Sequence, residues 1–348
     1  MARVAVVSYR LSGADGVSVE AAKWIAALRA LGHQVTTVAG SGRADVLVPG
    51  LALDATETPD APVAAALDGV DLVVIENVGS LPLNPSARES LYRVLAGRAT
   101  LWRHHDLPWQ RPHLARHDAP HDDPKWRHVT INEISRAELA QRGIVADCVP
   151  NTFDCNPPRG DRTTTRAALG LGDEWLALLA GRALERKNVP GALALCEEIG
   201  ATLWVLGPAE DGYGSTLDAL IARSSARVIL GLPTGHDVHD AYTASDLVVQ
   251  SSTWEGFGNP TIEAFTHRRP LALYPYPVSR EITRHGFRFF GLDDAKGVAD
   301  FLTRPDEELY DHNLALAREH YDIVGLPARF DALLAPFGLA TAGASLAR

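Results

Sequence analysis

Short apolar runs alternate with amphipathic ones along most of the chain. This alternation is typical of parallel β-strands covered by helices. In the first part of the chain, the apolar runs predict strands at residues 4–7, 34–38, 71–75, 100–102, 128–131 and 147–149. The amphipathic runs predict helices at residues 17–31, 86–95 and 135–141. Gly32 follows the first predicted helix, and glycine commonly ends a helix.

The composition changes at residues 151–165, which are rich in Pro, Thr, Gly and Arg and predict a linker. A second alternating series begins at Trp175. It predicts strands at residues 176–180, 202–206, 227–230, 247–249 and 270–274, and helices at residues 190–199, 215–223, 238–243, 307–320 and 328–334.

Two alternating series predict an α/β protein with two Rossmann-like, doubly wound domains. In such domains ligands bind at the carboxyl ends of the strands, so we expect a ligand in a cleft between the domains. We place the N-terminal domain at residues 1–155 and the C-terminal domain at residues 156–326. A helix within residues 327–348 is expected to cross back to the N-terminal domain, followed by a disordered tail at 340–348.

The bulk composition excludes several functions. The 348 residues carry a net charge of −10 and have a pI near 5.7, which argues against nucleic acid as a partner. Cys148, Cys155 and Cys196 lack the spacing of metal ligands, and we expect reduced thiols in a cytoplasmic protein. Neither a signal peptide nor a transmembrane segment is visible in the sequence, so we expect a soluble chain.

The most informative segment is residues 251–265, with the sequence SSTWEGFGNPTIEAF. It follows a predicted strand and leads into a predicted helix, with Pro260 suited to the first helical turn. We expect the backbone amides of residues 259–262 to point unpaired from the positive end of that helix toward a phosphate. Glu255 and Glu263 would not help to bind phosphate, but carboxylates can accept hydrogen bonds from sugar or ribose hydroxyls. The segment therefore predicts a nucleotide-sugar site.

A second motif follows the strand predicted at residues 176–180. There Arg182 and Lys187 precede Asn188, which can cap the next helix. Arginine offers a planar fork to phosphate oxygens, and lysine offers a point charge. Both motifs follow strands of the same half of the chain, so a diphosphate between them could be held without a metal.

The two motifs together resemble the retaining, family 4 glycosyltransferases of the GT-B architecture, also described as glycosyl transferases group 1. Further similarity lies in Val-Pro-Asn-Thr-Phe-Asp at residues 149–154 and in Ala-Tyr-x-Ala-Ser-Asp at residues 241–246. The resemblance implies a hexosyltransferase that uses a UDP- or GDP-sugar donor and a small polar or natural-product acceptor. It also implies that the N-terminal domain binds the acceptor and that the C-terminal domain binds the nucleotide-sugar. It implies no cofactor and no metal.

The resemblance also implies roles for individual residues. Arg182 and Lys187 would neutralise the donor diphosphate, Glu255 would face the transferred sugar, and Glu263 would bind the ribose. The remaining donor-binding residues of this segment would be Gly256, Phe257, Gly258, Asn259, Pro260 and Thr261.

In the N-terminal half, Gly16 resembles the second glycine of a loop whose amides meet the phosphate and the acceptor. His105 resembles a histidine that contacts the donor sugar, with His104 as its competitor. The sequence departs from the family at Asp15, where a loop glycine is common, and at Arg268 and Arg269, which replace a glycine-containing turn.

Three other functions remain open. A nicotinamide dehydrogenase is disfavoured because the loop at residues 13–16 lacks a third glycine in register, and the strand at 34–38 is not followed by an acid for the ribose. Another GT-B enzyme, such as an epimerase or a phosphorylase, would share the donor motifs. A non-catalytic nucleotide-sugar binder would bind a donor without transferring its sugar.

Overall fold

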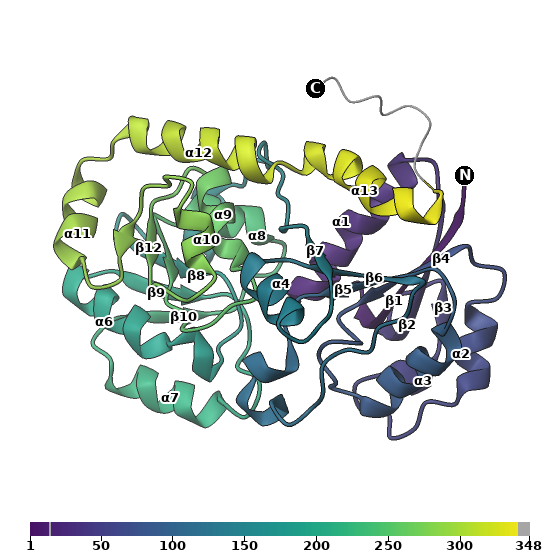
Figure 1. Cartoon of the computed structure of the whole chain (residues 1–348). Coiled ribbons are helices and arrows are strands. Elements are labelled where there is room, and N and C mark those ends of the chain that lie inside the picture. The colour runs from purple at the N-terminus through teal and green to yellow at the C-terminus, as the bar shows by residue number, and fades with distance from the viewer. Residues whose placement is uncertain (14, 340–348) are drawn as a thin grey trace. The chain divides into compact units, whose positions relative to one another are not determined.

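The computed structural model describes residues 1–13 and 15–339, so the predicted tail at 340–348 lies outside the described residues (Figure 1). The chain forms two compact units. Unit 1 comprises Met1–Asn151 together with the C-terminal segment that begins at Ile323, and unit 2 comprises Thr152–Asp322.

Unit 1 is built on a seven-stranded parallel sheet with the strand order β3-β2-β1-β4-β5-β6-β7. The strands are β1 (Arg3–Leu11), β2 (Gln34–Gly42), β3 (Val46–Leu47), β4 (Leu72–Glu76), β5 (Thr100–His104), β6 (Trp126–Thr130) and β7 (Ala146–Cys148). The helices are α1 (Gly16–Ala30), α2 (Asp60–Ala66), α3 (Pro85–Leu95), α4 (Glu133–Ala140) and α13 (Leu326–Leu334).

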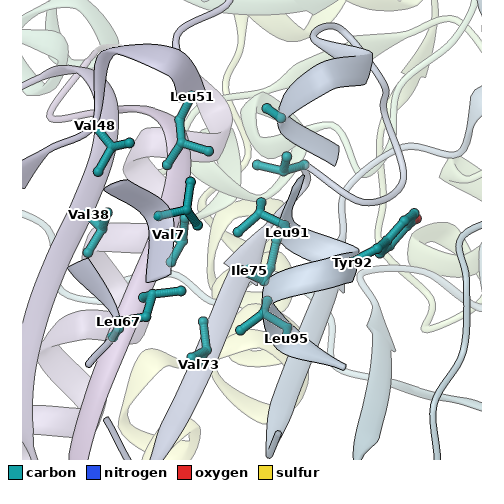
Figure 2. Packing of buried hydrophobic residues seen from close by; sticks show 14 of the residues in the cluster. Val7, Val38, Val48, Leu51, Leu67, Val73, Ile75, Leu91, Tyr92 and Leu95 are labelled. Atoms are coloured by element: carbon teal, nitrogen blue, oxygen red, sulfur yellow. The ribbon is translucent and has the colours of Figure 1, made fainter. Parts of the chain in front are cut away.

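Apolar side chains from alternate positions of the central strands fill both faces of this sheet. On one face, Val7 and Ile75 pack against Leu91 and Leu95 of α3 (Figure 2). On the other face, Trp24 of α1 meets Phe330 of α13 edge to face, with ring centroids 4.4 Å apart. Burial on both faces explains why β1 and β4 read as continuous apolar runs.

Unit 2 is built on a six-stranded parallel sheet with the order β10-β9-β8-β11-β12-β13. The strands are β8 (Leu176–Leu179), β9 (Thr202–Val205), β10 (Val228–Leu230), β11 (Leu247–Gln250), β12 (Leu271–Leu273) and β13 (Phe290–Gly291). The helices are α5 (Arg162–Ala168), α6 (Val189–Ile199), α7 (Gly214–Arg223), α8 (Val238–Ala244), α9 (Asn259–Thr266), α10 (Ser279–Thr283), α11 (Ala295–Thr303) and α12 (Glu307–Tyr321). Two doubly wound parallel sheets confirm the predicted α/β class.

One local prediction needs correction. Residues 162–165, assigned above to a linker, form the first turn of α5, and the side chain of Asp161 caps it by accepting from the amide of Thr164. After α9, Arg268 takes the left-handed conformation (φ 55°) that a glycine would adopt more easily. Its side chain pairs with Glu307 and Asp311 of α12, so ion pairs accompany the unfavourable backbone conformation.

Candidate functional site

The two motifs found in the sequence meet at one edge of the sheet of unit 2. β8 and β11 are neighbouring parallel strands, so the loops that follow them leave the sheet at the same end. A short 3₁₀ turn (Glu185–Lys187) follows β8, and Asn188 then caps α6 by accepting from the amide of Gly191. The loop after β11 carries Glu255.

Glu255 is held between two cations. Its Oε1 lies 2.5 Å from Nζ of Lys187, and its Oε2 lies 2.7 Å from a terminal nitrogen of Arg186. The hydroxyl of Ser252 also donates to Oε1 at 2.6 Å. The carboxylate group is therefore fixed in position before any ligand arrives.

Electrostatics keeps this carboxylate ionised. Burial alone would raise the pKa of Glu255, but Lys187 and Arg186 outweigh it and lower the pKa to about 2. Burial also lowers the pKa of Lys187, and the attraction of Glu255 only partly opposes that effect. The cluster has two cations and one anion, so it carries a net positive charge.

The sequence analysis named Arg182 and Lys187 as the cations of the donor site and did not name Arg186. Arg182 instead pairs with Glu210 at 2.5 Å, and both side chains are more than a third exposed. The 3₁₀ turn aims the consecutive residues Arg186 and Lys187 at the same carboxylate. A basic pair next to an Asn cap was the signal available in the sequence.

The start of α9 depends on Gly258. This residue has φ 96°, and an added Cβ would lie 1.9 Å from the hydroxyl of Tyr276, so no other residue fits without rearrangement. That hydroxyl donates to the carbonyl of Phe257 at 2.7 Å. Phe257 itself is 5 % exposed and stacks near Phe153, with centroids 5.9 Å apart, which is the environment of a packing residue.

The expectation of unpaired amides along residues 259–262 is wrong at Thr261. The amide of Thr261 donates to the carbonyl of Gly258 at 2.9 Å, within the first turn of the helix. Pro260 has no amide hydrogen to offer. Any phosphate contact at this tip thus falls mainly to residues before Pro260.

Glu263 lies on α9 and is positioned by a tyrosine. The buried Tyr242 of α8 donates its hydroxyl to Oε2 of Glu263 at 2.6 Å. The ring of Tyr242 stacks on His267, with centroids 4.4 Å apart. Burial lowers the pKa of His267 to about 4, so this ring is neutral at pH 7.

In unit 1, His105 follows β5 and contacts an acid that the sequence analysis missed. Its Nε2 lies 2.8 Å from Oε2 of Glu76, the last residue of the neighbouring strand β4. Glu76 is fully buried and also lies 3.4 Å from Arg103. Burial would raise the pKa of Glu76, but Arg103 and His105 keep it below its usual value.

Arg103 joins this acid to α1. It lies 3.4 Å from Glu20, donates to the side chain of Asn151 at 3.1 Å and stacks 4.0 Å above the ring of Trp24. The sequence did offer a signal for Glu76, because this acid ends the apolar run Leu-Val-Val-Ile-Glu.

His104 lies in a different environment from His105. It is 1 % exposed, stacks on His128 and shares a 2.8 Å hydrogen bond with that ring. Burial, together with His128 and His105, lowers its pKa well below the usual value for histidine. The structure therefore places His104 in the interior as the last residue of β5, and His105, which is also buried, directly after the strand.

Gly16 is the first residue of α1, and an added Cβ there would meet open space. Asp15 caps this helix by accepting from the amide of Ser18 at 3.1 Å, and it pairs with Arg10 at 3.0 Å. The start of α1 is thus already capped by a carboxylate of the chain.

Comparison with known proteins places this site in a family. The model of the glycosyl transferases group 1 family matches residues 161–302, which contain both donor motifs. The chain thus carries a domain of this family at these residues. It is a glycosyltransferase of the retaining, family 4 type, as its resemblance implied.

Two curated relatives cover most of the glycosyltransferase. Mannosylglucosylglycerate synthase of Thermotoga maritima is 26 % identical, and the match covers 88 % of each chain. The protein of the same name from Petrotoga mobilis is 23 % identical, with 83 % of this chain and 86 % of that protein covered.

Solved structures confirm the GT-B fold. Anabaena HepE in complex with UDP and glucose has a TM-score of 0.74 at 16 % identity, covering 97 % of this chain and 100 % of that one. Sucrose-phosphate synthase from Thermosynechococcus elongatus has the same TM-score and identity, with 98 % and 100 % covered.

Two structural features of the glycosyltransferase concern metals and membranes. Among residues 1–13 and 15–339, no three His, Cys, Asp or Glu side chains are grouped so that they could hold a metal ion. Over the same residues, no helix combines the length and apolar character needed to cross a bilayer.

Proposed function

We propose that this glycosyltransferase moves a hexosyl group from a nucleoside diphosphate sugar to a hydroxyl of a polar acceptor, without a metal ion. The observation that carries the proposal is the cluster of Arg186, Lys187 and Glu255 at the carboxyl ends of β8 and β11. It combines a net positive charge with one ionised carboxylate on the same rigid sheet edge.

The charge of this cluster fits the donor. A diphosphate brings two or more negative charges, and Lys187 together with Arg186 can neutralise part of them through charge-assisted hydrogen bonds. Arg182 can join them by exchanging its exposed partner Glu210, because an exposed ion pair contributes only about 0–1 kcal/mol. Such preorganised cations stabilise the charge that develops on the leaving diphosphate.

Glu255 and Glu263 would accept hydrogen bonds from different hydroxyls of the donor. We assign Glu255 to the hydroxyls of the transferred sugar, because Lys187 and Arg186 keep its carboxylate ionised and oriented. We assign Glu263 to the ribose, since Tyr242 fixes its carboxylate. Gly256 and Asn259 precede and follow Gly258 and would supply contacts to phosphate and sugar.

We keep two residues of unit 1 in the proposal. His105 would contact the donor sugar, with Glu76 holding its ring in place. Gly16 would leave room for a ligand beside the start of α1, because none of the described residues lies near the position of its missing side chain. In the proposed reaction the bond between the anomeric carbon and the phosphate oxygen breaks, the acceptor oxygen bonds to the same face, and its proton passes to the leaving phosphate.

The relatives suggest the class of substrate. Their name describes a product that contains mannose, glucose and glycerate, so we propose a mannosyl donor and an acceptor that carries a sugar acid. The nucleotide of the donor stays open between UDP and GDP. HepE was solved with UDP-glucose, which keeps UDP among the candidates.

The test is a thermal-shift screen of UDP- and GDP-sugars in the presence of EDTA. A matching donor should stabilise the protein without magnesium, and Lys187→Ala should abolish the shift because it removes a cation from the diphosphate site. Lys296→Ala serves as the control, since Lys296 is exposed on α11 and its ion pair among the described residues is with Asp300 of the same helix.

Product analysis then separates transfer from its alternatives. Incubation of the best donor with glycerate, glucosylglycerate and neutral sugars should give a glycoside and a free nucleoside diphosphate. Stabilisation without transfer or hydrolysis would indicate a non-catalytic binder, and a changed sugar without an acceptor would indicate an epimerase. An unchanged shift in Lys187→Ala would refute the proposed donor site.

A further inference from the structure

Unit 2 contains a cavity of about 460 Å³ that none of the donor motifs explains. It lies between the loop at residues 155–160, the C-terminal end of α9 and the first half of α12. Arg159, His267, Arg268, Arg269 and Tyr310 are among its lining residues. The proposed phosphate site is at the other end of α9, and eight residues of helix span about 12 Å.

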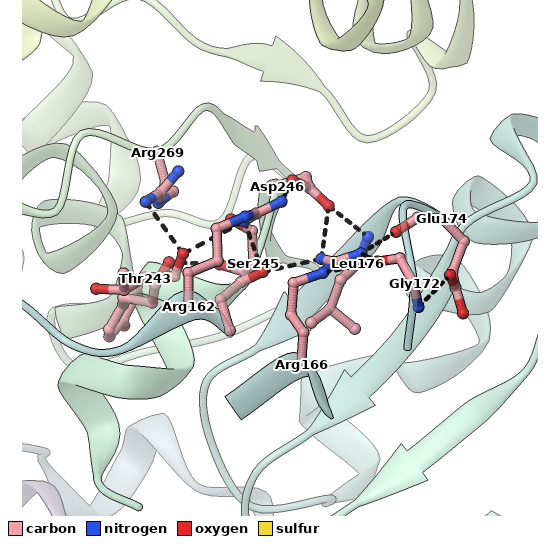
Figure 3. A network of polar contacts seen from close by, with 11 residues as sticks. Arg162, Arg166, Gly172, Glu174, Leu176, Thr243, Ser245, Asp246 and Arg269 are labelled. Carbon is pink, nitrogen blue, oxygen red and sulfur yellow. Dashed lines mark hydrogen bonds and ion pairs between the residues drawn. The ribbon is translucent and has the colours of Figure 1, made fainter. Parts of the chain in front are cut away.

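Arg269 is the unusual member of this lining. One of its terminal nitrogens donates to the carbonyl of Thr243 at 3.2 Å (Figure 3). Its Nε is buried and has no hydrogen-bond partner within the described residues. Burial, together with the nearby Arg162, lowers the pKa of Arg269. Burying a charged donor without an acceptor costs free energy. A ligand that gives this Nε an acceptor would therefore bind more tightly.

The acid near Arg269 is already occupied. Asp246 lies 2.5 Å from Arg162 and 3.2 Å from Arg166, and it also accepts from the amide of Leu176 (Figure 3). Two arginines thus pair with this carboxylate, and the described residues provide no ion pair for Arg269.

The other charged residues of the cavity lining do not neutralise Arg269. Glu307 lines the cavity but lies 2.7 Å from Arg268, which also pairs with Asp311. Arg159 is exposed, and the described part of the chain gives it no carboxylate partner. His267 is neutral at pH 7, because burial lowers its pKa to about 4. Two arginine charges of the lining are therefore left unneutralised.

We propose that this cavity is a second anion site, which binds the phosphoryl group of a small phosphorylated metabolite. A phosphoryl group carries up to two negative charges and offers several acceptor oxygens, which match the forks of Arg269 and Arg159. The cavity has room for a small molecule beyond the phosphoryl group, within the usual size range of ligand pockets.

Calorimetric titration with inorganic pyrophosphate, without divalent ions and at constant ionic strength, tests the site. Pyrophosphate should also enter the donor site, so the titration is made in wild type and in Lys187→Ala. Wild type should show two binding events and Lys187→Ala one. If the proposed donor site is wrong, wild type will show only the cavity event, and the two proposals can fail separately.

Variants of the lining locate the remaining event. In the Lys187→Ala background, Arg269→Gln should weaken pyrophosphate at least tenfold, and Arg159→Ala should weaken it several-fold. Arg159 is exposed, so its replacement leaves the fold intact. Arg223→Ala, at the exposed end of α7 and outside the lining, should change the affinity less than twofold. Loss of all binding in Lys187→Ala, or unchanged binding in both Arg269→Gln and Arg159→Ala, would overturn the proposal.

Discussion

Replacing Glu255 by Gln tests the electrostatic account of the donor site. The substitution keeps the shape of the side chain and removes its charge, which leaves Lys187 and Arg186 without their shared anion. Glutamine can still accept a hydrogen bond, so the main loss is electrostatic. We therefore expect unit 2 to become less stable at neutral pH.

The pKa of Glu255 sets the magnitude. Its value falls from 4.5 in the unfolded chain to about 2 in the folded one. At about 1.36 kcal/mol per pH unit, this difference corresponds to about 3 kcal/mol of stability at pH 7. Because the folded-state pKa is the lower one, the contribution is complete above about pH 4.5 and is lost as the pH falls toward 2. At pH 3.5 roughly 2 kcal/mol should remain, as the same linkage relation gives.

The assay is urea unfolding followed by hydrogen exchange at the amides of β8 and β11, which reports on unit 2 separately from unit 1. The difference between wild type and Glu255→Gln should shrink by about 1 kcal/mol or more between pH 7 and pH 3.5. Glu210→Gln is the control, because its exposed pair with Arg182 should contribute less than about 1 kcal/mol at pH 7. An equal loss for Glu255→Gln at both pH values would refute the reasoning.

Three further outcomes are expected. Tyr242→Phe removes the hydroxyl that positions Glu263, so calorimetry should show a several-fold weaker affinity for the donor nucleotide. Circular dichroism should show an unchanged fold, and an unchanged affinity would contradict the role of Tyr242. Glu76→Gln leaves Arg103 buried beside fewer anions, and urea unfolding of unit 1 should show a loss of about 3 kcal/mol; a loss below about 1 kcal/mol would be too small for a buried pair. Arg268→Gly relieves the left-handed backbone but removes two exposed ion pairs, so the free energy of unfolding should change by less than about 1 kcal/mol. Arg268→Val removes the same ion pairs and keeps the unfavourable backbone, so it should lose more stability than Arg268→Gly.

The sequence predicts most of the fold because local signals agree with the tertiary structure. The apolar run at residues 4–7 lies inside β1, and Asn188 caps α6 as its position before Pro190 suggests. Shorter elements gave weaker signals. β3 and β13 have two residues each, too few to show a period, and their strand conformation depends on pairing with β2 and β12.

The candidate site was harder to predict, because its contacts join residues far apart in the chain. Arg186 and Glu255 are 69 positions apart, and Glu76 and His105 are 29 apart. A sequence motif shows that two charges are present but not which partner each takes. Arg182 was expected at the diphosphate on the basis of its motif, yet its side chain pairs with Glu210.

The two helix tips explain why an anionic donor should prefer unit 2. At the start of α1, the carboxylate of Asp15 accepts from Ser18 and pairs with Arg10, so the positive helix end is already neutralised. At the start of α9, the capping residue is Gly258, which has no side chain and brings no negative charge to the helix end. An anion that approached α1 would meet a like charge, whereas one that approached α9 would meet the helix dipole and, in the same unit, the cations Arg186 and Lys187. The same Asp15 favours neutral hydroxyls as ligands of the α1 tip, because a carboxylate accepts hydrogen bonds from them.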